Sequence, residues 1–200
     1  MATSIVDICN NALVRIGSKT ITSLSDGDKV ANACNTVYAR ARDTLLRQHL
    51  WNFAITRTEL ASEEDAPVFG FSYSFPLPAD FIRAVKLDDT DSPYKIEQGK
   101  LVTDSSTAQL VYVARIEDVT KFDPLFVEAL TLSMAINLTY VLIGSNTREA
   151  SLKEELRSVL FLAKQVDGQD DTPDSMRPTT FTGAKMGYRD PTMVISEWEY

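Results

Sequence analysis

The segment from Asp123 to Gly144 constrains the fold of this chain more than any other part of the sequence. It begins with Asp-Pro, in which the aspartate suits a helix N-cap and the proline suits the first helical position. The residues that follow are apolar on nearly every face of a helix: Leu125, Val127, Ala129, Leu130, Met134, Ile136, Leu138, Val141 and Leu142. The run is interrupted by Thr, Ser and Asn and is shorter than the roughly 20 residues of a membrane span. Such a helix has to be covered by other elements, so we predict that it lies at the centre of a helical body.

Three further stretches have the spacing of amphipathic helices: residues 4–17, 28–50 and 146–166. Each starts with a Ser, Asp or Asn that suits an N-cap, and the first stops at a glycine. Apolar residues recur every three or four positions in each stretch, which places them on one face. We therefore predict a four-helix body built from residues 1–60 and 117–166.

The sequence between these helical parts has the pattern of a small antiparallel sheet. Short β-branched and aromatic runs alternate there with clusters of Pro, Gly, Asp and Ser. We expect strands near residues 71–75, 81–87, 94–97, 100–103 and 109–115. Gln98-Gly99 marks a hairpin turn, and residues 54–60 form a strand or an extended link. The predicted fold class is α+β, with residues 61–116 inserted as a small antiparallel β subdomain.

The last part of the chain, residues 167–200, has no periodic pattern. It opens with a Gly, Asp and Pro cluster that we expect to end the preceding helix. Large apolar residues then follow at irregular spacing: Met176, Phe181, Met186, Tyr188, Met193, Val194, Ile195, Trp198 and Tyr200. Fully extended, this segment spans about 110 Å at roughly 3.3 Å per residue. Because such residues rarely stay exposed, we expect an extended arm that binds another subunit; the alternative is a terminus that folds back on its own domain or frays.

The charge and the N-terminus restrict the partners that the chain can have. A formal net charge of −8 and a pI near 4.7 disfavour tight binding of nucleic acid, which needs Lys and Arg against the phosphates. A surface along which DNA passes with at most transient contact remains compatible with this charge. The N-terminus lacks the basic region and apolar core of a signal peptide. We therefore expect synthesis in the cytoplasm and no membrane partner.

The residue types that catalysis and metal binding need are scarce. His49 is the only histidine, so one chain cannot build a His-dependent triad or a two-His metal site. The sequence has no phosphate-binding loop, dinucleotide fingerprint or nucleophile elbow. Cys9 and Cys34 fall on apolar helix faces, where we expect reduced core thiols. We therefore expect no enzyme, no cofactor and no metal; the enzyme alternative predicts a polar cleft near His49 or Arg83.

Three blocks occur in a characteristic order: ICNNALVRIGSKTITSLSD, YARARDTLLRQHLWNFAITRTELA and YSFPLPADFIRAVKL. The first holds N-A-L-x-x-I-G. The second holds the pair Arg42 and Asp43, followed by W-x-F-A at residues 51–54. The third holds aromatic-x-L-P-x-D-aromatic-x-R at residues 75–83. Over roughly residues 4–165 this order resembles the adaptor proteins of short-tailed bacteriophages, also called tail tubular protein A or head-to-tail connector proteins.

The resemblance implies a structural virion protein, made in the host cytoplasm, that forms a ring of twelve copies. The ring would dock under the portal protein of the filled capsid, receive the tail tube or nozzle protein, and form part of the channel for genome ejection. It implies that the C-terminal segment becomes ordered on the portal, and we expect a monomer before assembly. The expected portal-contacting residues are Phe181, Tyr188, Met193, Val194, Ile195, Trp198 and Tyr200.

We interpret the motif residues themselves as structural anchors where the helices meet the sheet: Trp51, Phe53, Pro78, Asp80, Phe81 and Arg83. The helical body is expected to form the lateral contacts of the ring, and the turns of the β subdomain the surface for tail components. Two alternatives stay open. One is a stopper or tail-completion protein, which needs a plug that is not evident in the sequence. The other is a cellular binding module with a regulatory arm, which predicts that binding survives deletion of the arm.

Overall fold

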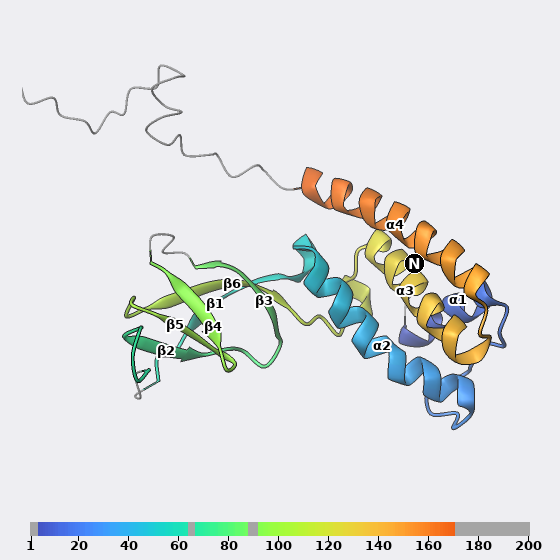
Figure 1. Cartoon of the computed structure of the whole chain (residues 1–200), viewed down its shortest axis with the longest axis horizontal. Helices are drawn as coiled ribbons and strands as arrows, with labels where there is room; N and C mark the ends of the chain where they lie inside the picture. Colours follow the sequence, from blue (N-terminus) through green and yellow to red (C-terminus); the bar gives the residue numbers. More distant parts are fainter. Residues whose placement is uncertain (1–3, 64–66, 88–91, 171–200) are drawn as a thin grey trace, which may run out of the picture. The chain divides into compact units, whose positions relative to one another are not determined.

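A computed structural model describes residues 4–63, 67–87 and 92–170. These residues form an α+β fold with four α-helices and two three-stranded antiparallel sheets (Figure 1). The described residues up to Asp170 belong to one compact unit. The expected portal-contacting residues all lie beyond Asp170, outside the described residues.

The helices begin and end where the capping residues of the sequence require. They are α1 (Ile5–Ile16), α2 (Lys29–Gln48), α3 (Pro124–Leu142) and α4 (Asn146–Gln169). The Asp123 carboxylate accepts hydrogen bonds from the backbone N–H groups of Leu125 and Phe126, which satisfies two unpaired donors of the first turn of α3. Gly17 ends α1 with a φ of 73°, a left-handed conformation that glycine adopts without a steric penalty.

Helix α3 is the central element of the helical body, as its apolar composition predicted. It packs against α1, α2 and α4. Several of its large side chains have no exposed surface: Phe126, Leu130, Leu132, Met134 and Leu138. By length and composition α3 could also cross a membrane, but its contacts with three neighbouring helices account for its apolar surface.

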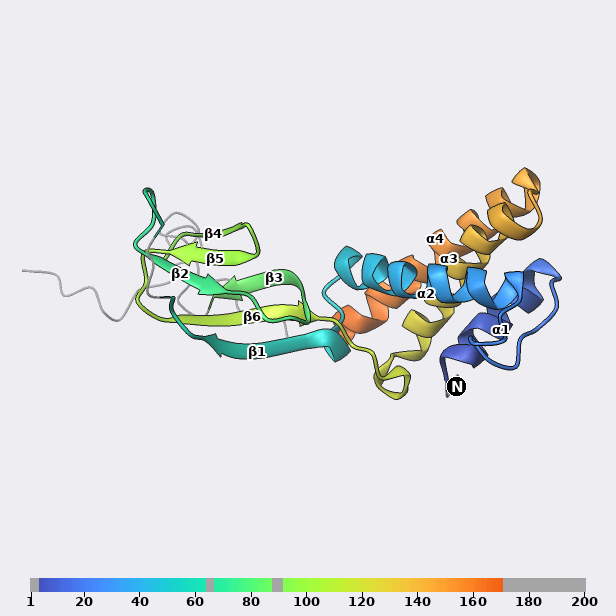
Figure 2. The ribbon, with the colours of Figure 1, turned by 90° about the horizontal axis from the view of Figure 1, so that it is seen from below.

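The strands form two sheets rather than the single small sheet that we expected. Their bounds are β1 (Ile55–Leu60), β2 (Tyr73–Pro76), β3 (Phe81–Leu87), β4 (Tyr94–Glu97), β5 (Lys100–Thr103) and β6 (Ala108–Ala114). The strand orders are β1-β6-β3 and β2-β5-β4 (Figure 2). The predicted hairpin turn at Gln98-Gly99 is confirmed, because both residues have a positive φ, 49° and 77°, as a type I′ turn requires.

Three predicted boundaries were wrong. Ile55–Leu60 pairs with β6, so the sheets begin before residue 60. Helix α4 continues to Gln169, so residues 167–169 are helical and do not belong to the arm. Ser145 caps α4 in place of Asn146, because its hydroxyl accepts the hydrogen bond from the Arg148 backbone N–H.

The apolar core has two parts. The larger part fills the helical body and also includes Ile82 of β3 and Val113 of β6. The smaller part lies among the strands and contains Leu60, Phe75, Leu87, Leu101, Leu110 and Tyr112. Because one strand pair contributes to both parts, the sheet β1-β6-β3 is fixed to the helices by apolar packing.

Truncating the central helix should test this description of the core. We expect Leu130→Ala to lower the free energy of unfolding by about 2 to 5 kcal/mol, because it removes a fully buried side chain and leaves a cavity. Val141→Ala, at a half-exposed position of the same helix, should cost less than about 1 kcal/mol. Denaturant unfolding of both variants measures the difference, and equal losses would contradict a central position for α3.

Candidate functional site

The predicted anchors gather around the corner where α2 ends and the chain enters the sheets. Trp51 is fully buried there, and its indole Nε1 donates a hydrogen bond of 2.9 Å to the Leu45 carbonyl in the last turns of α2. Its ring lies edge-on to Phe126, with 5.1 Å between ring centroids. The indole therefore satisfies its polar group while its apolar body joins the end of α2 to α3.

Phe53 extends this contact toward the start of α3. It lies in the 3₁₀ turn Asn52–Ala54, which links α2 to β1. Its ring centroid is 5.0 Å from that of Phe126 and 5.8 Å from that of Phe122. The side chain is partly buried, so it covers the aromatic cluster rather than forming its centre.

The Arg-Asp pair of the second sequence block joins α2 to the end of β6. The Asp43 carboxylate accepts from Arg42 Nε at 2.9 Å and from Arg115 Nε at 3.0 Å. Arg42 is buried, with its guanidinium 5.8 Å from the centre of the Tyr38 ring. One carboxylate thus neutralises two cations that come from elements far apart in the sequence.

A second polar contact joins α2 to β3. Arg47 donates a hydrogen bond of 2.6 Å to the Ile82 carbonyl, and Arg83 donates one of 3.4 Å to the Arg47 carbonyl. Arg83 is otherwise exposed, so its aliphatic part is not the core anchor that its motif suggested. Its contact with the C-terminal turn of α2 places a cation at the negative end of the helix dipole.

The turn before β3 is closed by the residues of the third sequence block. The Phe81 N–H donates to the Pro78 carbonyl at 3.0 Å, and the Arg115 N–H donates to the Asp80 carbonyl at 2.6 Å. The Tyr112 hydroxyl donates to the Asp80 carboxylate at 3.0 Å. Burial and the Asp80 hydrogen bond raise the pKa of Tyr112 to about 12. Phe81 stacks on Tyr112 and is only partly buried.

Asp167, which we had placed in the arm, holds the end of α4 against this same corner. Its carboxylate lies 2.8 Å from His49 Nε2 and accepts from the Asn52 N–H at 3.1 Å. The Asn52 side chain donates to the Asp167 carbonyl at 2.7 Å. These contacts explain why α4 continues past the residue where its apolar stripe ends.

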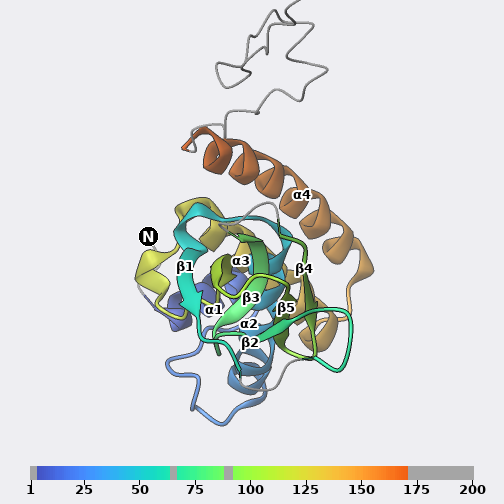
Figure 3. The ribbon, with the colours of Figure 1, turned by 90° about the vertical axis from the view of Figure 1, so that its left-hand side faces the viewer.

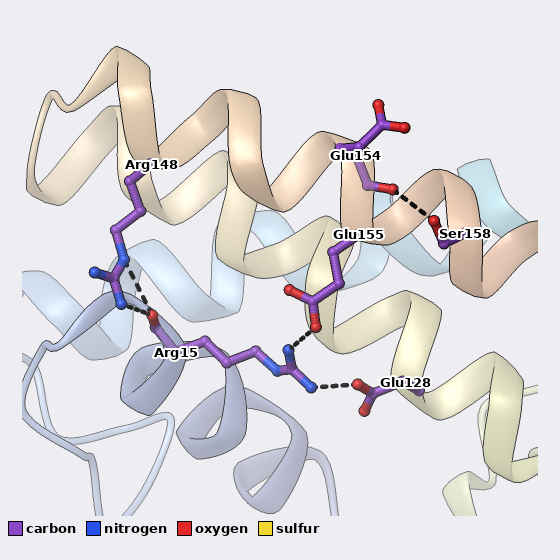
Figure 4. A network of polar contacts seen from close by, with 6 residues as sticks. All are labelled: Arg15, Glu128, Arg148, Glu154, Glu155 and Ser158. Carbon is purple, nitrogen blue, oxygen red and sulfur yellow. Dashed lines mark hydrogen bonds and ion pairs between the residues drawn. The ribbon is translucent and has the colours of Figure 1, made fainter.

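Another network attaches the start of α4 to α1 and α3 (Figure 4). The Arg15 guanidinium pairs with Glu155 at 2.6 Å and with Glu128. Arg148 Nε donates to the Arg15 carbonyl at 3.2 Å. Helix α4 packs against α3 and lies at the outside of the helical body (Figure 3). This network attaches its first half, and the Asp167 contacts attach its end.

Of the other predicted chemistry-bearing residues, Cys9 and Cys34 contact each other, and His49 is paired with a different residue. His49 has Asp167 as its polar partner, and Cys9 and Cys34 are buried thiols without a disulfide. The contact with Cys34 and burial raise the pKa of the Cys9 thiol. Within residues 4–63, 67–87 and 92–170, no three His, Cys, Asp or Glu side chains come together as metal ligands.

Two open hollows are present on the part of the chain that the structure describes. One, of about 530 Å³, lies beside the start of α4 and is lined by Arg15, Ser145, Thr147, Arg148, Ser151, Leu152 and Glu155. The other, of about 280 Å³, lies across β1 and β6. In the first, Arg15 and Glu155 already pair with each other.

The bridge through Asp43 gives a test of the joint between helices and sheets. We expect Asp43→Ala to lower the free energy of unfolding by about 1 to 3 kcal/mol, because the buried Arg42 loses its closest carboxylate. Glu154→Ala removes an exposed ion pair with Arg157 and should change stability by less than about 1 kcal/mol. Denaturant unfolding compares the two, and an equally small change for both would contradict the role of Asp43.

Alkaline titration gives a second test. Burial is the main cause that raises the pKa of both Tyr38 and Tyr112 to about 12, from an ordinary value of 10. The folded chain thus keeps these phenols protonated where the unfolded chain ionises them. Their contribution to stability is present below pH 10 and is lost as the pH rises from 10 to 12.

Tyrosinate absorbance against pH should therefore show two late-ionising groups. Tyr112→Phe should remove one of them, and Asp80→Asn should lower the pKa of Tyr112, because the hydrogen bond and charge of Asp80 help to raise it. An unchanged late step in both variants would contradict the Tyr112–Asp80 contact.

A scan against protein-family models finds no family that matches this chain, and a search of curated proteins finds no match. A functional assignment has to rest on the residues and on the contacts that they make.

Proposed function

We propose that this chain is a structural adaptor of a short-tailed bacteriophage virion. In this role it forms a ring that joins the capsid portal to the tail tube or nozzle. The ring surrounds part of the channel through which the genome is ejected. The proposal carries over the twelve-copy stoichiometry and the portal and tail partners that the sequence resemblance implies.

One observation supports this proposal more than any other. The second and third sequence blocks are separated along the chain, yet their residues contact one another where α2 meets β3; the first block begins in α1, which packs against α3. Arg42 and Asp43 of the second block meet Arg115, and Arg47 of that block binds the backbone of the third block at Ile82. In a family of structural proteins, we expect the shared residues to be those that make such hydrogen bonds and ion pairs. These contacts support the proposal because they give the residues of the second and third blocks a structural role.

The arm supplies the physical mechanism of portal binding in this proposal. Residues 171–200 carry Phe181, Trp198 and Tyr200 among other large apolar residues, and burying these between portal subunits offsets the entropy lost when the arm becomes ordered. Each single arm binds weakly. A ring repeats the contact around the portal, so the assembled complex dissociates far more slowly than one subunit would.

The charge of the chain suits a channel through which DNA moves. A net charge of −8 disfavours tight binding of DNA phosphates, which would slow a passing duplex. Mild repulsion along the channel keeps DNA contacts transient. Within this proposal, the protein is located in the connector region of the virion.

Light scattering of the purified chain with its cognate portal ring tests the proposal. We expect a monomer alone and a discrete multi-copy complex with the portal. A chain that ends at Asp170 keeps the Asp167 contacts and the whole compact unit, so it should fold but lose the complex. Trp198→Ala in the full chain should weaken the complex at least about tenfold if Trp198 is a main anchor.

Two results would contradict the proposal in different ways. If neither chain binds the portal ring, the adaptor function is wrong. If the chain ending at Asp170 binds as tightly as the full chain, the arm is not the portal-binding segment.

A further inference from the structure

Strand β1 forms an open edge of its sheet. The strand order is β1-β6-β3, so β6 covers one side of β1, and no strand among the described residues pairs with the other side (Figure 2). The pairing of Ile55–Leu60 with β6 has no register shift. The outer side of β1 is therefore regular over its whole length. Such an edge presents unpaired backbone N–H and C=O groups, on which a further strand can form.

The other strand edges in the described part of the chain are less suited to a further strand. Strand β3 has two register shifts against β6, and its Ile82 carbonyl already accepts a hydrogen bond from Arg47. Strands β2 and β4 have four residues each; β2 ends with Pro76, and Pro93 directly precedes β4. Bulges, short strands and prolines are features that protect a sheet edge from pairing. The outer side of β1 has none of them.

The hydrogen bonds of β6 determine which of its residues face β1. The Arg115 N–H donates to the Asp80 carbonyl, on the β3 side of β6. Successive residues of an antiparallel strand direct their backbone groups to opposite sides. Counting back from Arg115, Tyr112 and Leu110 therefore direct their N–H and C=O groups toward β1.

The same alternation assigns the backbone groups of β1. Thr56 and Thr58 lie opposite the two β6 residues that face β1, so their backbone groups bind β6. Arg57 and Glu59 alternate with them and direct their N–H and C=O groups outward. The Glu59 carbonyl accepts a hydrogen bond of 3.3 Å from the Thr58 hydroxyl. This contact is long for a hydroxyl donor, so an added strand can replace it.

The side chains of Arg57 and Glu59 give this edge a charge pattern. They lie on the same face of β1, because residues two positions apart share a face. Both are exposed, and neither takes part in an ion pair within residues 4–63, 67–87 and 92–170. The edge therefore carries one cation and one anion on successive outward-facing residues.

This pattern is complementary to itself in one antiparallel register. When Thr58 lies opposite Thr58 of a second copy, Arg57 of each copy lies opposite Glu59 of the other. Both residues direct their backbone groups outward, so each Arg57–Glu59 pair can exchange two backbone hydrogen bonds. A shift of the register by two residues places Arg57 opposite Arg57 or Glu59 opposite Glu59. Like charges directly opposite each other are unfavourable, which selects the first register.

We propose that β1 pairs antiparallel with β1 of a second copy of this chain, in the register that places Arg57 opposite Glu59. The contact has two-fold symmetry, whereas neighbours in a ring around one axis meet through two different surfaces. It therefore goes beyond the proposed function and belongs to the free chain before a ring closes. A contact of one strand per copy is smaller than the roughly 1,200 Å² of a stable interface. Dilute protein is thus monomeric, and pairs form as the concentration rises.

Sedimentation equilibrium of the full chain tests the pairing, from about 10 μM to about 1 mM. We expect the mass to rise from one copy toward two. Arg57→Glu and Glu59→Arg should each weaken pairing at least about tenfold, because like charges then face each other twice. The two reversals change the net charge in opposite directions, so net charge cannot explain a loss in both.

An equimolar mixture of the two variants should pair like the unaltered chain, because the acidic strand of one then faces the basic strand of the other. This rescue also shows that both variants are folded. Lys164→Glu is the matched control. It changes the net charge as Arg57→Glu does, at an exposed position of α4, and should leave pairing unchanged.

Disulfide formation tests the register itself. In the proposed pair, Thr58 lies opposite its own copy in a non-hydrogen-bonded position, where Cα atoms are about 4.5 Å apart and a disulfide can form. Mild oxidation of Thr58→Cys should therefore give a linked dimer in non-reducing electrophoresis. Thr56→Cys, on the same face of β1, lies opposite Leu60 of the second copy and should stay unlinked. Cys9 and Cys34 are buried and should not react.

Two results would overturn the inference. The unaltered chain could sediment as one copy at every concentration while Thr58→Cys stays unlinked. Alternatively, pairs could persist in both charge reversals, or cross-links could form equally at positions 56 and 58, which would place the contact elsewhere. All these measurements use the free chain. A failure of pairing is therefore distinct from a failure of the adaptor function, in which no portal complex forms.

Discussion

The burial of α3 is the constraint on which the rest of the structure depends. A helix that is apolar on every side needs neighbours on every side, and here α1 and α2 precede it in the sequence while α4 follows it. The strands that lie between α2 and α3 in the sequence must therefore leave the helical body and return to it. Pairing of β1 with β6 meets this requirement, because it brings the two ends of the inserted strands together, with Ile55 opposite Val113.

Local signals in the sequence predicted the elements of this fold well. Helix caps and tight turns depend on residues that are close in sequence, so their positions can be predicted without tertiary contacts. Examples are Asp123, Gly17 and the Gln98-Gly99 turn. The strand order and the division into two sheets could not be predicted, because pairing depends on distant residues. The role of the Asp167 side chain could not be predicted either, because its partner is distant in the sequence. Its hydrogen bonds to Asn52 extend α4, and no pattern within the helix itself signals them.

The candidate sites differ in how far the sequence revealed them. The aromatic and Asp-Arg positions stood out as a motif, and the structure gives each one a contact, although Phe81 and Arg83 are more exposed than an anchor in a core would be.

The inserted position of the sheets also governs the order in which this chain can fold during synthesis. Helices α1 and α2 leave the ribosome first, but their main apolar partner begins at Pro124, 76 positions after the end of α2 at Gln48. Until then the helices lack the partner that covers most of their buried faces, although Ile82 of β3 and Val113 of β6, which share this core, are made earlier. Closing so long a loop is entropically costly, and non-local contacts of this kind slow folding. The nascent chain therefore exposes the faces of α1 and α2 for the whole time that the strands are made, which is an interval suited to chaperone binding.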